Sequence, residues 1–176
     1  RYGLMLDENG MVMDDGVTAC ISDTQFYMTT TTGGAARVLT WLERWHQTEW
    51  PELQVWMTSV TDHWSTVAIV GPKAREVLAR LTQDIDLAAS AFAYMDWRAG
   101  TVAGLRARVF RISFSGELAY EVNVESGHGE RLSMRYTTID DPNGTQLRSV
   151  RVDRRWFPGK RCLRNDTSGL WDCTPL

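Results

Sequence analysis

The chain has 176 residues, of which 43% are hydrophobic and 23% charged, and its formal net charge is −3. This length and composition predict one globular domain or a large part of one, and they argue against a disordered chain. The acidic balance disfavours nucleic-acid binding, and no run approaches the roughly 18 apolar residues of a membrane-spanning helix. Three cysteines without a CxxC pair disfavour a disulfide framework or a zinc ribbon. We therefore expect a cytoplasmic protein without a metal site.

The first third of the chain alternates apolar runs with clear turn signals. The sequence DENG at 7–10 predicts the tight turn of a hairpin, because Asn-Gly favours such turns. A helix is expected to begin at Gly33-Gly34, with apolar side chains at 3.6-residue spacing, and Pro51 blocks its continuation. The strands predicted in this part cover residues 2–6, 11–13, 17–21 and 25–32.

The chain from residue 52 to about residue 130 mixes strand and helix patterns. A second helix is predicted to start at Gly71-Pro72, since proline suits a first helical turn. Blocks of strand, helix and strand joined to antiparallel hairpins predict an α+β domain. The strands predicted here cover residues 53–60, 64–70, 91–97, 100–104, 105–115 and 118–124.

The charge balance and the apolar periodicity of the sequence change near residue 130. Residues 1–130 hold 10 Lys and Arg against 17 Asp and Glu, whereas residues 131–176 hold 9 against 5. The periodicity of the apolar residues fades at the same place. We therefore expect one domain over 1–130 and an atypical basic tail over 131–176 that packs poorly against it. Truncation or a reading-frame slip is one hypothesis for this change. The start of the chain, without Met or a signal peptide, predicts a piece of a longer polypeptide.

Two adjacent carboxylates, Asp14 and Asp15, form the most distinctive local feature. Neighbouring residues of a strand point to opposite faces, so one side chain is expected to face inward. An inward carboxylate costs free energy unless a hydrogen bond, a cation or a ligand compensates it. A solvated pair at the edge of a turn is the simpler alternative, and the local sequence alone favours it.

A second candidate carboxylate lies in the segment LAYEVNV at 118–124. The alternation places Tyr120, Val122 and Val124 on one face of a strand and Glu121 with Asn123 on the other. If that other face lines a pocket, the carboxylate of Glu121 can bind paired N–H donors of a flat heterocycle. If it faces solvent, Glu121 is an ordinary surface residue, and the periodicity leaves both readings open.

Three long segments of the chain carry a recognisable family pattern. They read RYGLMLDENGMVMDDGVTA, TTTTGGAARVLTWLERWHQTEWPELQVWMTSVTDHWSTVAIVGP and GTVAGLRARVFRISFSGELAYEVNV. The pattern resembles the folate-binding, aminomethyltransferase-like region of the alpha subunit of heterotetrameric sarcosine oxidase. More distantly it is similar to the T protein of the glycine cleavage system. The resemblance covers about residues 1–126 and implies an N-terminally incomplete folate-binding domain with a mixed or antiparallel sheet and flanking helices.

The resemblance also implies roles for individual residues. Asp15 matches the catalytic carboxylate of the family, close to the reactive nitrogens of tetrahydrofolate. Glu121 matches the carboxylate that holds the pterin edge, and Tyr2 matches an aromatic residue that lines the folate site. Thr31 and Thr32 lie where the family brings a loop near the ligand, although the T protein has Asn there.

The function implied by the resemblance is one-carbon capture during the oxidative demethylation of sarcosine, with 5,10-methylenetetrahydrofolate as the product. The implied partners are the other subunits of a hetero-oligomer, with FAD, FMN and NAD bound on other segments of the parent complex. Two alternatives are an aminomethyltransferase of the glycine cleavage system and a non-catalytic binding or assembly module with the same fold.

Overall fold

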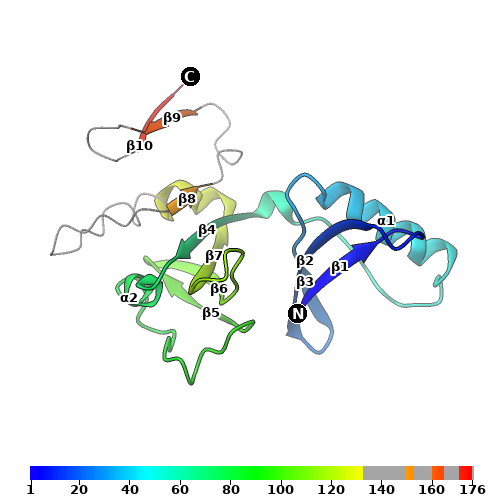
Figure 1. The fold of residues 1–176 in the computed structure, drawn as a ribbon, viewed down its shortest axis with the longest axis horizontal. Helices are drawn as coiled ribbons and strands as arrows, with labels where there is room; N and C mark the ends of the chain where they lie inside the picture. Colours follow the sequence, from blue (N-terminus) through cyan, green and yellow to red (C-terminus); the bar gives the residue numbers. More distant parts are fainter. Residues whose placement is uncertain (133–149, 153–159, 165–170, 176) are drawn as a thin grey trace. The chain divides into compact units, whose positions relative to one another are not determined.

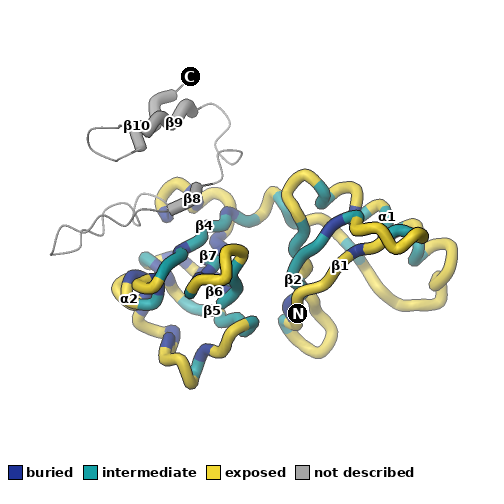
Figure 2. The backbone as a smooth tube through the Cα atoms, viewed as in Figure 1, coloured by how far each residue is buried: buried dark blue, intermediate teal, exposed yellow. Residues whose placement is uncertain are grey.

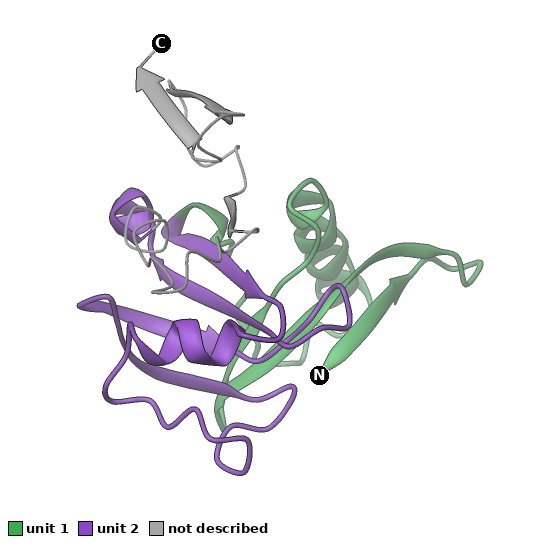
Figure 3. Ribbon diagram, turned by 60° about the vertical axis from the view of Figure 1, so that its left-hand side comes forward, with its two compact units in different colours: residues 1–62 green, residues 63–176 purple. Residues whose placement is uncertain are grey.

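The computed structural model describes residues 1–132, 150–152, 160–164 and 171–175. The chain divides into two compact units, residues 1–62 and residues 63–176 (Figures 1 and 3). Both units contain antiparallel strands and α-helix, so the expected α+β class is confirmed. The predicted boundary at residue 130 stays a prediction. The expected tail falls largely on residues 133–149, 153–159, 165–170 and 176, which lie outside the described residues.

The first unit is built on a three-stranded antiparallel sheet in the order β1-β2-β3. The hairpin turn forms as predicted, with Gly10 at a φ of 76° and the Asp7 carboxylate accepting hydrogen bonds from the Asn9 and Met11 N–H groups. The two strands expected at 11–13 and 17–21 form one continuous strand. The strands are β1 (Tyr2–Leu6), β2 (Val12–Ser22) and β3 (Gln25–Met28).

Helix α1 (Ala35–Thr48) follows the sheet, and its predicted start and end are confirmed. Its side chain Val38 is buried, while Trp41, Trp45 and Trp50 form a chain of ring contacts. The strand predicted at 53–60 is wrong, because the structure has no strand between α1 and the second unit. The alternating side chains of this segment, such as Val55 and Trp56, stay exposed and bury no face of a strand.

The second unit contains a five-stranded antiparallel sheet in the order β5-β6-β7-β4-β8. A separate antiparallel pair is formed by β9 and β10. The strands are β4 (Trp64–Val70), β5 (Trp97–Val102), β6 (Leu105–Phe110), β7 (Ala119–Glu125), β8 (Val150–Val152), β9 (Lys160–Arg164) and β10 (Trp171–Pro175).

The core of the second unit lies on one face of this sheet. Figure 2 shows where its buried residues lie along the backbone. Alternate residues of β4 and β7, among them Val67 and Val122, pack there with Val77 and Leu78 of helix α2 (Ala74–Ala79). The helix begins three residues after Gly71, later than predicted, because neither Gly71, with a φ of 123°, nor Lys73, with a φ of −95° and a ψ of 5°, has a helical backbone. The 3-10 turn η1 (Thr61–His63) directly precedes β4 in the sequence, and η2 (Ser126–His128) directly follows β7.

The strands predicted at 91–97 and 105–115 are shorter than the apolar pattern indicated. Residues 91–96 form turns, and β6 ends at Phe110. The apolar pattern around Phe92 has another cause, since this side chain is fully buried and its ring lies edge-on to Tyr120 with the centroids 5.7 Å apart. A buried turn residue and a strand residue give the same local signal.

Candidate functional site

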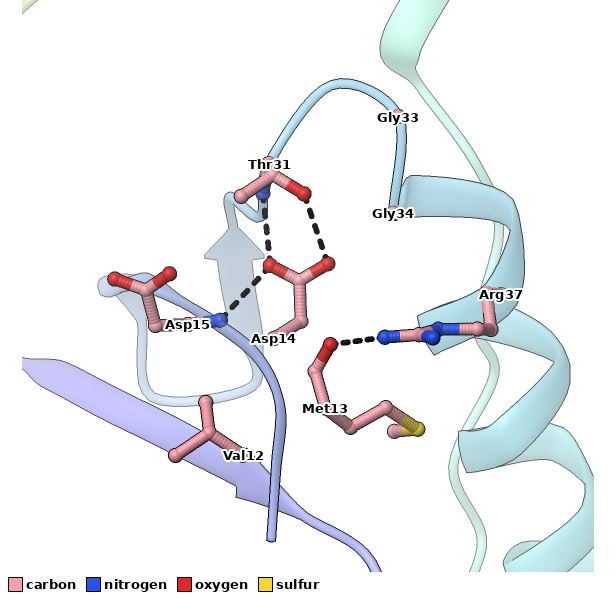
Figure 4. Close-up of a pocket in the computed structure, with 8 residues that line it drawn as sticks. All are labelled: Val12, Met13, Asp14, Asp15, Thr31, Gly33, Gly34 and Arg37. Atoms are coloured by element: carbon pink, nitrogen blue, oxygen red, sulfur yellow. Dashed lines mark hydrogen bonds between the residues drawn. The ribbon is translucent and has the colours of Figure 1, made fainter.

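An open pocket of about 470 Å³ lies in the first unit, between β2 and the start of α1 (Figure 4). The acidic pair of β2 lies in its wall, together with the glycine-rich loop that leads into the helix. The pocket is lined by Val12, Met13, Asp14, Asp15, Thr31, Gly33, Gly34 and Arg37.

Asp14 is the inward-facing member of the acidic pair, with 6% of its surface exposed. Its Oδ1 accepts hydrogen bonds from the backbone N–H groups of Asp15 at 2.8 Å and Thr31 at 3.1 Å, and its Oδ2 accepts the Thr31 hydroxyl at 2.9 Å. Burial alone would raise the pKa of Asp14. These hydrogen bonds and the nearby Arg37 outweigh it and lower the pKa below its usual value. Asp14 is therefore a carboxylate at neutral pH, and donors from two segments hold it.

Asp15 points away from Asp14 and is half-buried. The Tyr2 hydroxyl donates a hydrogen bond of 2.7 Å to its Oδ2. This bond raises the pKa of Tyr2, with smaller contributions from desolvation and from the charge of Asp15. The expected opposite orientation of the two carboxylates is confirmed, and two of the candidate residues, Tyr2 and Asp15, are brought into direct contact.

The loop before α1 approaches β2 closely. A side chain at Gly34 would place its Cβ 1.6 Å from Oδ2 of Asp14, so only glycine fits there. The guanidinium of Arg37 donates to the Met13 carbonyl, which adds a second link between the helix and β2. Thr31 contacts Asp14, as described above, and Thr32 is exposed in the same loop. A contact of either threonine with a ligand stays a prediction.

Glu121 lies in the second unit, on β7, with Ala68 of β4 and Phe110 of β6 as its strand neighbours. It lies on the sheet face opposite the apolar core, as its alternation predicted. Within the described part of the chain, its carboxylate has no hydrogen bond and no ion pair. Burial raises its pKa above the usual value. An unpaired, partly desolvated carboxylate is suited to receive N–H donors from a ligand.

The face that carries Glu121 is not a freely solvated surface. Asn123, two residues along the strand, is 4% exposed, and its Oδ1 accepts a hydrogen bond of 2.6 Å from the Thr66 hydroxyl. Phe110 is also buried, and its ring stacks on Trp97 with the centroids 6.2 Å apart and the planes inclined by 28°. Sequence reasoning missed Phe110 and Trp97. The strand register places Phe110 opposite Glu121 and Trp97 opposite Phe110 on the next strand, and no local pattern specifies that register.

We predict that Glu121→Gln stabilises the protein at neutral pH. A raised pKa means that the folded state binds the proton of Glu121 more tightly than the unfolded chain does, so stability decreases as the pH rises from the unfolded pKa through the folded one. Glutamine removes this unfavourable ionisation. The melting temperature of the variant should exceed that of the wild type near pH 7, and the difference should vanish below about pH 4, where glutamate is protonated in both states. An equal or lower melting temperature near pH 7 contradicts the prediction.

The candidate residues fall in both units. Tyr2, Asp15, Thr31 and Thr32 belong to the first unit, and Glu121 belongs to the second.

Among the described residues, no group of three or more His, Cys, Asp or Glu side chains is arranged to hold a metal ion. In the same part of the chain, no helix is long and apolar enough to span a bilayer.

Comparison with known proteins gives one family and two kinds of relative. The family model of the GCVT N-terminal domain matches residues 1–150. Sarcosine oxidase subunit alpha of Corynebacterium sp. (strain P-1) is 54% identical over 133 residues, and that of Rhizobium meliloti (strain 1021) is 46% identical over 135 residues. These matches cover 75% and 76% of the chain, but in each case only 14% of the relative. An aminomethyltransferase of Chloroherpeton thalassium is 31% identical over 132 residues, which are 75% of the chain and 34% of that protein.

Proposed function

The chain belongs to the GCVT N-terminal domain family, and we propose that it is the tetrahydrofolate-binding part of a sarcosine oxidase alpha subunit. In this role it captures the one-carbon unit released from sarcosine as 5,10-methylenetetrahydrofolate. The identities of 46% and 54% to sarcosine oxidase alpha subunits, against 31% to an aminomethyltransferase, support this branch of the family.

The observation that carries the proposal is the state of Glu121. Its carboxylate is partly desolvated, its pKa is raised by burial, and none of the described residues donates a hydrogen bond to it. The pterin ring of tetrahydrofolate is flat and presents N–H donors along one edge. A carboxylate that accepts these donors regains the hydrogen bonds that burial removed, which fits binding better than a structural role.

Asp15 is the proposed general base. The carbon of oxidised sarcosine is joined to the nitrogen of glycine by a C=N double bond. Each of two amine nitrogens of tetrahydrofolate forms a bond to this carbon, while both bonds of the C=N double bond break. Each attacking nitrogen loses one proton, and the departing amine of glycine gains both, so no proton is consumed overall. The carboxylate of Asp15 takes up the first proton, returns it to the amine, and stabilises the cationic carbon that passes between them. Its half-buried position in the pocket wall permits contact with both a ligand and Tyr2.

The proposal includes a larger assembly in the cytoplasm. FAD, FMN and NAD are assigned to other segments or subunits, where the oxidation of sarcosine takes place. The first unit has a surface that other segments or subunits can contact. Alternate residues of β1 place Tyr2, Leu4 and Leu6 on one exposed face. Val12, which pairs with Leu6 in the strand register, is exposed as well. Apolar side chains gathered in this way are typical of surfaces that other protein segments cover.

An aminomethyltransferase of the glycine cleavage type is the second candidate, supported by the match to the enzyme of Chloroherpeton thalassium. It would take its carbon from a lipoyl carrier protein, not from oxidised sarcosine. A non-catalytic assembly module is the third, and it predicts no folate binding.

One experiment separates the three candidates. The intact enzyme that carries this chain is titrated with tetrahydrofolate and then supplied with sarcosine or with an aminomethylated lipoyl carrier. We expect folate binding and folate-dependent product from sarcosine. Product from the carrier alone supports the second candidate, and absence of folate binding rules out both enzymes.

A further inference from the structure

We propose that Asp14 is a positioning residue for Asp15: it fixes the backbone of the catalytic carboxylate and ties it to the loop before α1. The inference rests on the proposed role of Asp15 and extends it to a residue that none of the sequence patterns assigned to the reaction.

The first support is the direct contact between the two residues. Oδ1 of Asp14 accepts the backbone N–H of Asp15 at 2.8 Å. A hydrogen bond to the N–H of the following residue restrains the peptide that joins them, and this peptide sets the direction in which the Asp15 side chain leaves β2. Asp14 therefore controls the orientation of Asp15 without touching a ligand.

The second support is the connection to the loop. The carboxylate of Asp14 accepts both the N–H and the hydroxyl of Thr31, seventeen residues further along the chain. Gly34 leaves room for Oδ2 of Asp14 that no other residue type would leave. Because Thr31 of the loop donates hydrogen bonds to Asp14 and Gly34 leaves room for its carboxylate, the loop and β2 form one fixed wall of the pocket (Figure 4).

The third support is that Asp14 is poorly suited to proton transfer. Both of its oxygens accept hydrogen bonds, it is 6% exposed, and those bonds lower its pKa. A base that must take a proton from a bound ligand needs a free oxygen and access to the ligand. The two adjacent carboxylates therefore have different roles: Asp15 transfers the proton, and Asp14 keeps Asp15 in position.

The hydrogen bonds of Thr31 indicate a role other than the folate contact expected from the family resemblance. Its hydroxyl and its N–H are both directed to Asp14, so we assign it to the support of the acidic pair. Its expected contact with folate is not needed to explain its position.

The test compares three variants in the intact enzyme by single-turnover formation of methylenetetrahydrofolate. Asp14→Asn keeps an oxygen for the two N–H donors, and the Thr31 hydroxyl can reverse to accept from the new amide. It should retain most of the rate. Asp14→Ala removes every contact and should lower the rate by about tenfold, since a displaced catalytic group costs up to about a hundredfold. Asp15→Asn should be slower than either.

The pH profile separates positioning from proton transfer. Asp14→Ala should lower the rate at every pH without moving the midpoint of the profile, because the titrating base is unchanged. If Asp14→Asn is as slow as Asp15→Asn, or if Asp14→Ala is as fast as wild type, the positioning role is wrong. If Asp15→Asn itself has no effect, the assignment of the base in the proposed function fails instead.

A second pair of variants covers the case in which Asp14→Ala does not assemble. Thr31→Val removes only the hydroxyl that Asp14 accepts, and Thr31→Ser keeps it. The valine variant should be slow with unchanged folate affinity, and the serine variant should recover the rate. Equal rates for valine, serine and wild type overturn the proposal.

Discussion

Asp15→Asn should slow the formation of methylenetetrahydrofolate by about 10²–10⁴-fold, the usual contribution of a general base. Asparagine keeps the size of the side chain and can still accept the hydrogen bond from Tyr2, but it lacks the charge and the basic oxygen. Folate affinity should stay close to that of the wild type, because we assign the pterin contact to Glu121 in the proposed function. Rapid-quench measurement of product, with a separate equilibrium titration of folate, checks both expectations.

The matched control is Tyr2→Phe, which removes the hydroxyl that contacts Asp15 and leaves both carboxylates in place. It should change the rate far less than Asp15→Asn does. If Asp15→Asn loses folate affinity as strongly as it loses rate, then Asp15 binds the ligand and is not the base.

Glu121→Ala should weaken the binding of tetrahydrofolate by about one to two orders of magnitude. The variant leaves the N–H donors of the pterin without an acceptor in a partly dry site, and a hydrogen bond to a charged group contributes roughly 1.5–3 kcal/mol. Equilibrium titration of the intact enzyme gives the dissociation constant. Glu125→Ala is the control, because Glu125 lies four residues further along β7 on the same sheet face and is exposed. Unchanged affinity in Glu121→Ala, or equal losses in both variants, contradicts the assigned role.

The affinity for folate should also depend on pH in a definite direction. Burial raises the pKa of Glu121, so this carboxyl takes up a proton at a higher pH than an exposed glutamate does. The protonated form has one acceptor fewer for the pterin donors. Binding should therefore weaken as the pH falls through the raised pKa, and the dependence should disappear in Glu121→Gln.

The parts of the fold that local chemistry determines were predictable from the sequence. The Asn-Gly turn, the limits of α1 set by Gly34 and Pro51, the strand at 64–70 and the alternation in β7 all appear in the structure. The failures share one cause. Alternation at 53–60 and the apolar run at 91–96 describe side chains only, and a strand also needs a neighbour with free backbone groups.

In the candidate site, too, local patterns predicted some features, and contacts with distant segments decided the others. The sequence predicted that Asp14 and Asp15 point to opposite sides, and the family resemblance, confirmed by the match to residues 1–150, singled out Asp15. Which carboxylate is buried depends on Thr31, a residue that the fold brings to β2 from a distant loop. The partial burial of Glu121 likewise depends on β4 and β6, its neighbours in the sheet, and no single-strand pattern contains that information.

The fate of the methyl carbon of sarcosine tests the central claim most directly. The intact enzyme, wild type or Asp15→Asn, is given sarcosine labelled in its methyl group, saturating tetrahydrofolate and a scavenger of free formaldehyde, for a single turnover. The account predicts that the wild type delivers the label to methylenetetrahydrofolate. The variant should oxidise sarcosine at the same rate but deliver the label to the scavenger. Equal partition of the label in the two enzymes would contradict it.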